Sequence, residues 1–179
     1  MQVEWSREGF ERLGFVGWKR FAEITKADLP PDPGVYVVTT TPGARPVFLA
    51  ESVGGPHKRR PLTVPVVTLE AAWRDGAEVV YVGKAAGARG LQDRLWAYAK
   101  QGRGQSAGHQ GGRYIWQLPD SGSLLVGWRA TPGFNPEHVE EALLALHIEE
   151  FGRRPFANLR DNRTPPRVAR ALVAEAFAV

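Results

Sequence analysis

Residues 79–100, VVYVGKAAGARGLQDRLWAYAK, bring two tyrosines and two cations together in one short segment. The segment begins as an apolar strand and ends in a helical pattern, with Tyr81, Lys84, Arg94 and Tyr98 around the junction. The planar fork of arginine suits bidentate contact with a phosphate group. Nearby cations also favour the charged form of a tyrosine, whose usual pKa is about 10. The four residue types therefore suit acid–base chemistry on a phosphate group.

Two strands and a helix must position these side chains. PPDPGVYVVTT predicts a turn and then a strand at 34–40, and EVVYVG predicts a second strong strand. After the glycine-rich AAGARG, the spacing of Leu91, Leu95 and Tyr98 predicts a helix with Arg94 on its border.

The rest of the chain divides into segments around this core. Residues 1–32 predict a short helical or irregular cap that packs aromatic side chains onto the core. Residues 41–77 are punctuated by Pro and Gly and predict an insertion with one or two short strands and a helical turn. KQGRGQSAGHQGGR predicts a flexible loop, and RYIWQL and SLLVGWRA predict two strands joined by the turn PDSG.

Two further helices complete the expected fold. FNPEHVEEALLALHIEEFG has Asn135 as a candidate N-cap, Pro136 at the first helical position and acidic residues in its first turn. Residues 161–179 contain TPPRVARALVAEAFAV, which predicts a C-terminal helix. Strands in hairpin-like pairs with helices between and after them indicate an α+β fold, with a small, mainly antiparallel sheet flanked by helices.

Composition narrows the class of protein. The chain has 179 residues, expected to form a single domain over 1–179, with a net charge of +4 and no cysteine. No disulfide, thiolate nucleophile or cysteine zinc site is possible, and there is no run long enough to span a membrane. Without a secretory signal at the N-terminus we expect a cytoplasmic protein. The sequence has no histidine spacing typical of a metal site, no P-loop and no Gly-x-Ser-x-Gly elbow.

The order of the polar residues resembles the GIY-YIG nuclease superfamily over roughly residues 33–160. The resemblance is carried by Gly34-Val35-Tyr36, Tyr81-Val82-Gly83-Lys84, Arg94 and Tyr98, then Glu140 before two leucines, and Asn158 in PFAN. Each motif alone is common in strands and helices, whereas their conjunction in one order favours the family. The resemblance implies a metal-dependent endonuclease that hydrolyses phosphodiester bonds in DNA.

The resemblance also implies a role for each residue, and the chemistry is consistent with it. Glu140 would hold Mg²⁺ (or Mn²⁺), since hard cations prefer carboxylate oxygens. Arg94 would stabilise charge on the scissile phosphate, and Lys84 would add a second positive charge. Cations beside the tyrosines are expected to lower their pKa, with Tyr36 the first choice and Tyr81 the second for the general base.

Three assignments need further explanation. Tyr98 would orient the attacking water or a phosphate oxygen, and Asn158 would brace the site by hydrogen bonds. Glu140 is preferred to Glu141 as the metal ligand because it lies on the helix face that continues into the apolar residues.

The chain departs from compact family members in the segment between the two signature tripeptides, which spans residues 37–80. A tight hairpin is therefore impossible, and the inserted HKRRP cluster could bind phosphates or be a solvated loop. Candidate nucleic-acid-binding residues are Lys58, Arg59, Arg60, Arg89, Arg103, His109 and Arg113. Two alternatives stay open, a non-catalytic nucleic-acid-binding module of the same fold and an RNA-directed nuclease. The sequence leaves the oligomeric state open.

Overall fold

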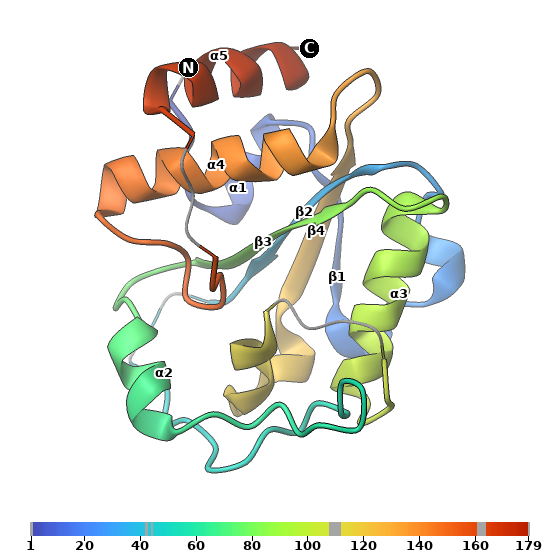
Figure 1. Ribbon diagram of the computed structural model, residues 1–179, viewed down its shortest axis with the longest axis vertical. Coiled ribbons are helices and arrows are strands. Elements are labelled where there is room, and N and C mark those ends of the chain that lie inside the picture. Colours follow the sequence, from blue (N-terminus) through green and yellow to red (C-terminus); the bar gives the residue numbers. More distant parts are fainter. Residues whose placement is uncertain (1, 42, 44, 108–111, 161–163, 179) are drawn as a thin grey trace.

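The computed structural model describes residues 2–41, 43, 45–107, 112–160 and 164–178. Its centre is an antiparallel sheet of four strands in the order β1-β4-β2-β3, which confirms the α+β class (Figure 1). The strands are β1 (Val16–Arg20), β2 (Gly34–Thr39), β3 (Val79–Ala85) and β4 (Leu125–Ala130). The two strongest strands predicted from the sequence, β2 and β3, are direct neighbours despite the long segment between them.

Helices lie on both sides of the sheet. They are α1 (Arg7–Arg12), α2 (Val66–Ala72), α3 (Gly90–Gly102), α4 (Pro136–Phe151) and α5 (Pro166–Ala176). Short 3₁₀ turns are η1 (Phe21–Glu23), η2 (Lys26–Asp28), η3 (Arg113–Gln117) and η4 (Ser121–Ser123). In Figure 1, α4 and then α5 cover the upper face, and α3 lies on the opposite side. Within the described part of the chain, no helix is long and apolar enough to cross a membrane.

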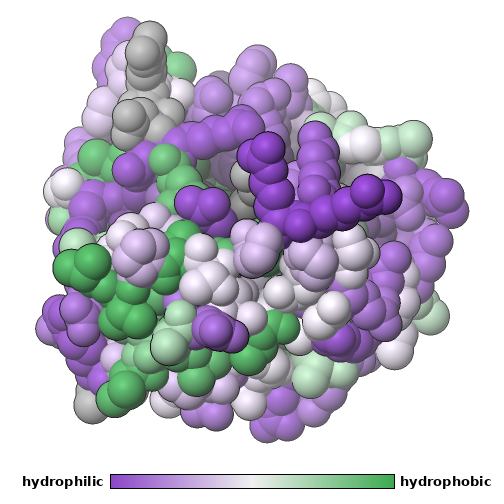
Figure 2. Space-filling view, turned by 60° about the horizontal axis from the view of Figure 1, so that its bottom comes forward, coloured by the Kyte–Doolittle hydropathy of each residue, from purple (hydrophilic) through white to green (hydrophobic). Residues whose placement is uncertain are grey.

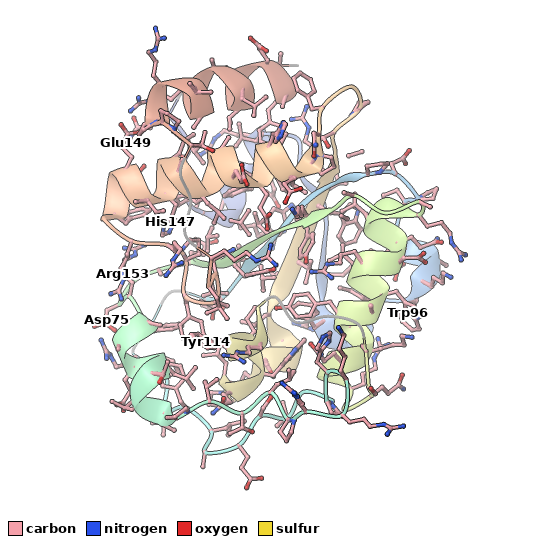
Figure 3. All side chains as sticks on the ribbon, viewed as in Figure 1. Asp75, Trp96, Tyr114, His147, Glu149 and Arg153 are labelled. Carbon is pink, nitrogen blue, oxygen red and sulfur yellow. The ribbon has the colours of Figure 1, made fainter. Side chains whose placement is uncertain are left out.

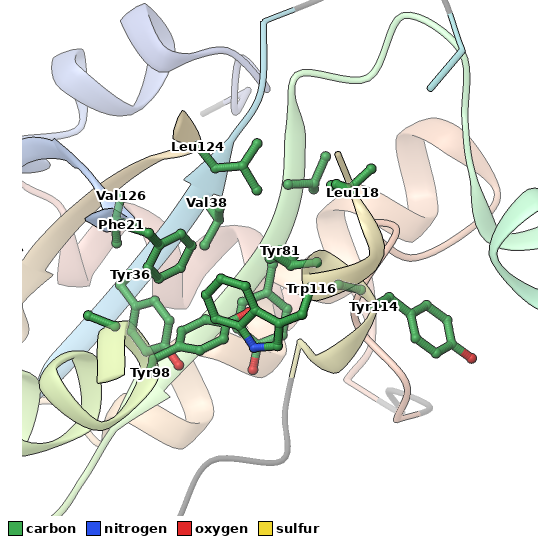
Figure 4. Close-up of a cluster of buried hydrophobic side chains, with 14 of the residues drawn as sticks. Phe21, Tyr36, Val38, Tyr81, Tyr98, Tyr114, Trp116, Leu118, Leu124 and Val126 are labelled. Atoms are coloured by element: carbon green, nitrogen blue, oxygen red, sulfur yellow. The ribbon is translucent and has the colours of Figure 1, made fainter. Parts of the chain in front are cut away.

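Alternation along β2 divides the interior into two cores. Val35 and Val37 pack with α4, α5 and the N-terminal aromatics, while Tyr36 and Val38 pack with α3, η3 and the insertion (Figure 4). Successive side chains of a strand point to opposite faces, so a strand buried on both faces is apolar throughout. All six residues of β2 are buried.

The predicted start of the long helix is confirmed. The side chain of Asn135 accepts a hydrogen bond from the backbone N–H of Glu137 at 2.8 Å, and Pro136 is the first helical residue. Gly152, with φ of +69°, ends the helix in a left-handed conformation that favours glycine. Glu140 is therefore held one turn into a well-defined helix.

The N-terminal segment does more than cap the core. Its aromatics are buried as expected, but residues 16–20 also form β1, which pairs with β4 at one edge of the sheet. The sequence did not predict this strand. Gly17, with φ of +95°, lies against the ring of Trp128, and the register shifts between Val16 and Lys19, so regular alternation is lost.

The prediction of a strand at RYIWQL is wrong, because these residues form η3. Tyr114 to Leu118 are all buried, a pattern without the alternation of a strand exposed on one face. The side chain of Gln117 accepts from Val64 N (2.8 Å) and donates to Leu49 O (3.0 Å) and Val64 O (3.0 Å). Side-chain hydrogen bonds to the insertion thus take the place of a strand partner.

The insertion packs against this turn. Its described residues contain α2 and no strand, so the helical turn was predicted correctly and the short strands were not. Phe48 stacks on Phe156 with ring centroids 5.6 Å apart, and Trp73 meets the same ring edge-on at 5.1 Å. These contacts hold the insertion against the segment that follows α4.

Candidate active site

Three tyrosines from three elements meet beside β3. Ring centroids are 6.0 Å apart for Tyr36 and Tyr81, 6.3 Å for Tyr36 and Tyr98, and 5.9 Å for Tyr81 and Tyr98 (Figure 4). Tyr36 comes from β2, Tyr81 from β3 and Tyr98 from α3. All three predicted tyrosines therefore form one aromatic cluster.

Gly83 explains part of the YVG motif. It lies opposite Tyr36 in the β2–β3 register, and a Cβ there would come within 2.4 Å of Tyr36 Cζ. Directly opposite residues of an antiparallel pair share a face, so the tyrosine ring needs the space that a side chain would take. Glycine at 83 therefore permits the position of Tyr36.

The tyrosines do not have the lowered pKa values expected from the sequence. Burial raises the pKa of Tyr36, and it raises those of Tyr81 and Tyr98 well above the ordinary value. Arg94 opposes the rise in each case but does not overcome the loss of solvation. The three phenols are neutral at physiological pH, which contradicts a phenolate base in the free protein.

Tyr98 also differs from its predicted role. Its side chain is fully buried and its hydroxyl donates to the backbone carbonyl of Gly112 at 3.0 Å. The hydroxyl thus fixes the start of η3.

Arg94 supplies the cation of the tyrosine cluster. It is half-buried on α3 and is hydrogen-bonded to Tyr36. Burial acts to lower its pKa, but the neighbouring tyrosines outweigh this and hold the pKa above its ordinary value. The guanidinium therefore stays charged in a partly desolvated position, where its interaction with an anion is stronger than in water.

Lys84 and two carboxylates form the other half of the site. Lys84 lies opposite Val35 in the register and so faces the α4 side of the sheet. Its ammonium pairs with Glu137 and lies 4.0 Å from Oε2 of Glu140. Glu137 was not singled out from the sequence, although it stands one helical turn before Glu140, a spacing that places both on one side of α4.

Burial strongly perturbs the ionisation of the Glu140 carboxyl group. Its side chain is only 16% exposed, and burial raises its pKa to about 7. Lys84, Arg94 and Arg160 act to lower the pKa, whereas Glu137 raises it. Glu140 in turn raises the pKa of Tyr36 and Tyr81, so the carboxylate and the tyrosine cluster lie within electrostatic range of each other.

Arg160 is a second residue missed in the sequence. Its charge lowers the pKa of both Glu137 and Glu140. It is exposed and stands two residues after Asn158, which pairs beside β3. Its place near the carboxylates depends on that pairing, and no local sequence signal indicates it.

Asn158 braces the site from the outer edge of β3. Its Oδ1 accepts from Val82 N at 2.9 Å and its Nδ2 donates to Val82 O at 2.8 Å, while Ala157 N donates to Val80 O at 2.9 Å. The side chain satisfies two edge groups that would otherwise be unpaired. The bracing role predicted from the sequence matches this geometry.

Replacing Asn158 with Ala is expected to destabilise the protein by about 2–4 kcal/mol, because two buried backbone groups of Val82 lose their partners. Urea unfolding at neutral pH measures the change. Leu159→Ala, at a partly exposed neighbouring position, serves as the control with a smaller expected cost. Equal losses in the two variants would contradict the bracing role.

His147 shows that a shifted pKa alone does not mark the site. Burial lowers its pKa to about 4, and its ring packs edge-on against Trp5 at 4.7 Å. Its Nδ1 lies 2.6 Å from the carbonyl oxygen of Arg153 (Figure 3). The histidine joins α4 to the segment that follows it, and we assign it a structural role.

The predicted nucleic-acid-binding residues fall into different environments. Arg103 donates to the backbone carbonyls of Ala22 and Ile24, and its guanidinium lies over the ring of Trp96. These contacts within the protein engage the guanidinium. Arg89 pairs with Asp93 on the surface at 3.3 Å. The guanidinium of Arg113 has a buried Nε, near Tyr114. His109 lies outside the described residues, and Lys58, Arg59 and Arg60 are exposed.

The carboxylates of Glu140 and Glu137 are suitable ligands for a hard divalent cation that takes only one or two of its ligands from the protein. No group of three or more His, Asp or Glu side chains that could hold a metal occurs in the described ranges. Mg²⁺ commonly uses one or two carboxylates and fills its other positions with water and substrate oxygens. Glu140 supplies a largely buried carboxylate whose charge lacks full compensation, with Glu137 beside it.

Comparison of the chain with family models, curated proteins and solved structures finds no match.

Proposed function

We propose that this protein is a metal-dependent endonuclease of GIY-YIG type that hydrolyses phosphodiester bonds in DNA. The observation that carries the proposal is Glu140, a largely buried carboxylate next to Lys84 and in electrostatic range of Arg94 and the tyrosines. A purely structural glutamate at this position would be expected to form a close ion pair. Burial instead raises its pKa to about 7, so its ionised form is one that a bound cation would stabilise.

The residues divide the work of hydrolysis between them. Arg94 would bind the scissile phosphate with its fork and stabilise the charge that develops on it. Tyr36 and Tyr81, neutral in this environment, would orient the attacking water through their hydroxyls. Mg²⁺ held by Glu140 would lower the pKa of that water and offset phosphate charge. Lys84 would keep the carboxylate pair in position.

The direct test is cleavage of supercoiled plasmid, labelled single-stranded DNA and labelled RNA, with Mg²⁺ or Mn²⁺ and with chelator. We expect metal-dependent cutting of DNA by the wild type and its loss in Glu140→Gln. Glu150→Gln, an exposed change at the far end of α4, is the matched control. Preferred cutting of RNA would support the RNA-directed nuclease instead.

One observation favours a second candidate, a nucleic-acid-binding module without catalysis. Tyr36 and Tyr98 are fully buried, and the Tyr98 hydroxyl is engaged by Gly112. Retained DNA binding with no cutting of any substrate would support this reading and reject the nuclease.

Metal binding should depend on pH because Glu140 must lose a proton to bind a cation. With a pKa of about 7, its carboxylate is mostly protonated at pH 6 and mostly ionised at pH 8. The apparent affinity for Mg²⁺ is expected to rise by about tenfold between these values. Calorimetric titrations in buffers of different ionisation enthalpy measure affinity and proton release together. An affinity independent of pH would contradict Glu140 as the ligand.

A further inference from the structure

The insertion presents a basic turn with an unusual backbone. His57 and Arg60 exchange two backbone hydrogen bonds, with His57 N to Arg60 O at 3.0 Å and Arg60 N to His57 O at 2.9 Å. Lys58 and Arg59 between them have φ of +49° and +65°. Two successive left-handed residues define a turn that normally takes Asn-Gly, since side chains other than glycine are strained there. We call residues 57–60 the basic turn.

The basic turn keeps its positive charges exposed. Lys58, Arg59 and Arg60 all lie on the surface, and within the described ranges none of them forms an ion pair. Several other surface cations are paired, as in Arg45 with Asp75 and Arg170 with Glu149. A cluster of three adjacent, exposed cations attracts polyanions.

The turn is fixed to the end of α3. Gly55 N donates to Gln101 O at 2.7 Å, and a Cβ at Gly55 would come within 2.1 Å of Gln105 O. Ser106 Oγ donates to Pro56 O at 3.2 Å, and His57 Nδ1 lies 3.3 Å from Ala107 O. The basic turn is therefore held against a defined surface, at the lower end of α3 in Figure 1.

The same helix connects the turn to the candidate site. Arg94 stands seven residues before Gln101, which is about 10 Å along the helix axis. Successive base pairs of duplex DNA are about 3.4 Å apart, so this distance corresponds to about three steps. A nucleic acid with a phosphate on Arg94 would therefore reach the basic turn within a few nucleotides.

The surface beside the turn has a different character. Figure 2 views the molecule from the side of the insertion, with hydrophobic side chains gathered at its left and hydrophilic ones towards its upper right. The exposed apolar residues of the insertion include Val47 and Val67, the latter on α2. The three adjacent cations of the basic turn lie at the part of the insertion that packs against α3.

We propose that the basic turn is a second phosphate-binding point, which holds the DNA backbone a few nucleotides from the bond placed at Arg94. The inference rests on the proposed function for the identity of the ligand. It adds that the insertion, which separates β2 and β3, serves to anchor the substrate. Lys58 and Arg59, which are both exposed, provide the contacts.

The test is the double variant Lys58→Asn with Arg59→Gly, which converts the turn to its preferred sequence. Binding to a labelled DNA duplex is measured by fluorescence anisotropy over a range of salt concentrations, with chelator to prevent cutting. We expect the affinity to fall about tenfold and the plot of log affinity against log salt to become less steep by about two. The melting temperature should equal or exceed that of the wild type, because Asn-Gly suits positive φ.

The matched control is Arg167→Ala with Arg170→Ala, which removes two charges from α5 on the opposite side of the molecule (Figure 1). An equal loss of affinity and slope in both double variants would overturn the proposal and leave only a general charge effect. Unchanged binding in the turn variant would overturn it as well. Binding and cutting are scored separately, so a protein that binds through the turn but never cuts would reject the nuclease alone.

Discussion

Glu140→Gln is expected to stabilise the metal-free protein by about 3 kcal/mol at pH 8 and to leave its stability unchanged near pH 4. The same substitution is expected to abolish metal-dependent cleavage. A gain in stability together with a loss of cleavage is the trade-off expected of a carboxylate kept for function.

The sign follows from the two states of Glu140. Its pKa is about 7 in the folded protein and 4.5 in the unfolded chain, so the folded state binds the proton more tightly. Its contribution to stability is fully present below pH 4.5 and is lost as the pH rises through 7. Glutamine cannot ionise and does not pay this cost, so the variant gains stability as the pH rises.

Urea unfolding with chelator at pH 4.5, 6, 7 and 8 measures the difference between variant and wild type. Glu137→Gln is the control, since Lys84 holds the pKa of that half-exposed carboxyl below its usual value. That variant should lose stability above pH 4.5 relative to the wild type. A Glu140→Gln variant with no gain at pH 8 would show that the carboxylate is compensated in the folded protein.

Arg94→Met is expected to reduce the rate of cleavage by at least a thousandfold while DNA binding falls by less than tenfold. The charge on phosphate oxygens increases in the transition state, and a preorganised guanidinium stabilises that charge more than the ground state. Removal of a cation at such a position commonly costs several orders of magnitude in rate. Methionine keeps the unbranched apolar stem beside the tyrosine rings.

Single-turnover cleavage with saturating enzyme separates this effect from binding. Arg20→Met, at an exposed arginine paired with Glu23 at 3.0 Å, should cut at the rate of the wild type. A parallel loss of rate and affinity in Arg94→Met would indicate that the arginine only binds DNA. The ultraviolet titration of the tyrosines gives a second readout, since loss of Arg94 should move their ionisation to still higher pH.

The two variants probe opposite charges held in one partly desolvated site. Arg94 stays ionised because the ordinary pKa of arginine lies far above neutral pH and its surroundings do not lower it. Glu140 is poised between its two states because burial raises its pKa to about 7, and Lys84 lies 4.0 Å away. The ionised Glu140 therefore lowers the stability of the free protein at pH 8. A bound metal ion would relieve part of that cost, and it should raise the melting temperature.

Much of the framework followed from the sequence alone. Residues 34–40 and 78–83 gave strong strand signals because they are rich in β-branched and aromatic side chains. Both strands are in fact buried on both faces. Asn135 with Pro136 marked the start of α4, since side-chain capping is a local interaction. The order of the tyrosines, Arg94 and Glu140 along the chain could likewise be seen in the sequence and indicated the candidate site.

Only the tertiary structure shows which strands pair and which side chains cover them. The partner of β1 is β4, more than a hundred residues away in the chain, and η3 replaces a strand because Gln117 bonds to the insertion. The free edge of β3 is covered by Asn158, which no local pattern foretells. These are long-range contacts, and local propensity carries no information about them.

The ionisation of the site shows the same division most clearly. The sequence placed cations beside the tyrosines and so predicted lowered pKa values, whereas the structure buries Tyr36 and Tyr98 completely and raises them. Residue types and spacing determined which charges are neighbours. Only the packing of α3 and α4 around β3 determined how much water reaches them, and desolvation outweighs the attraction of a single half-buried arginine.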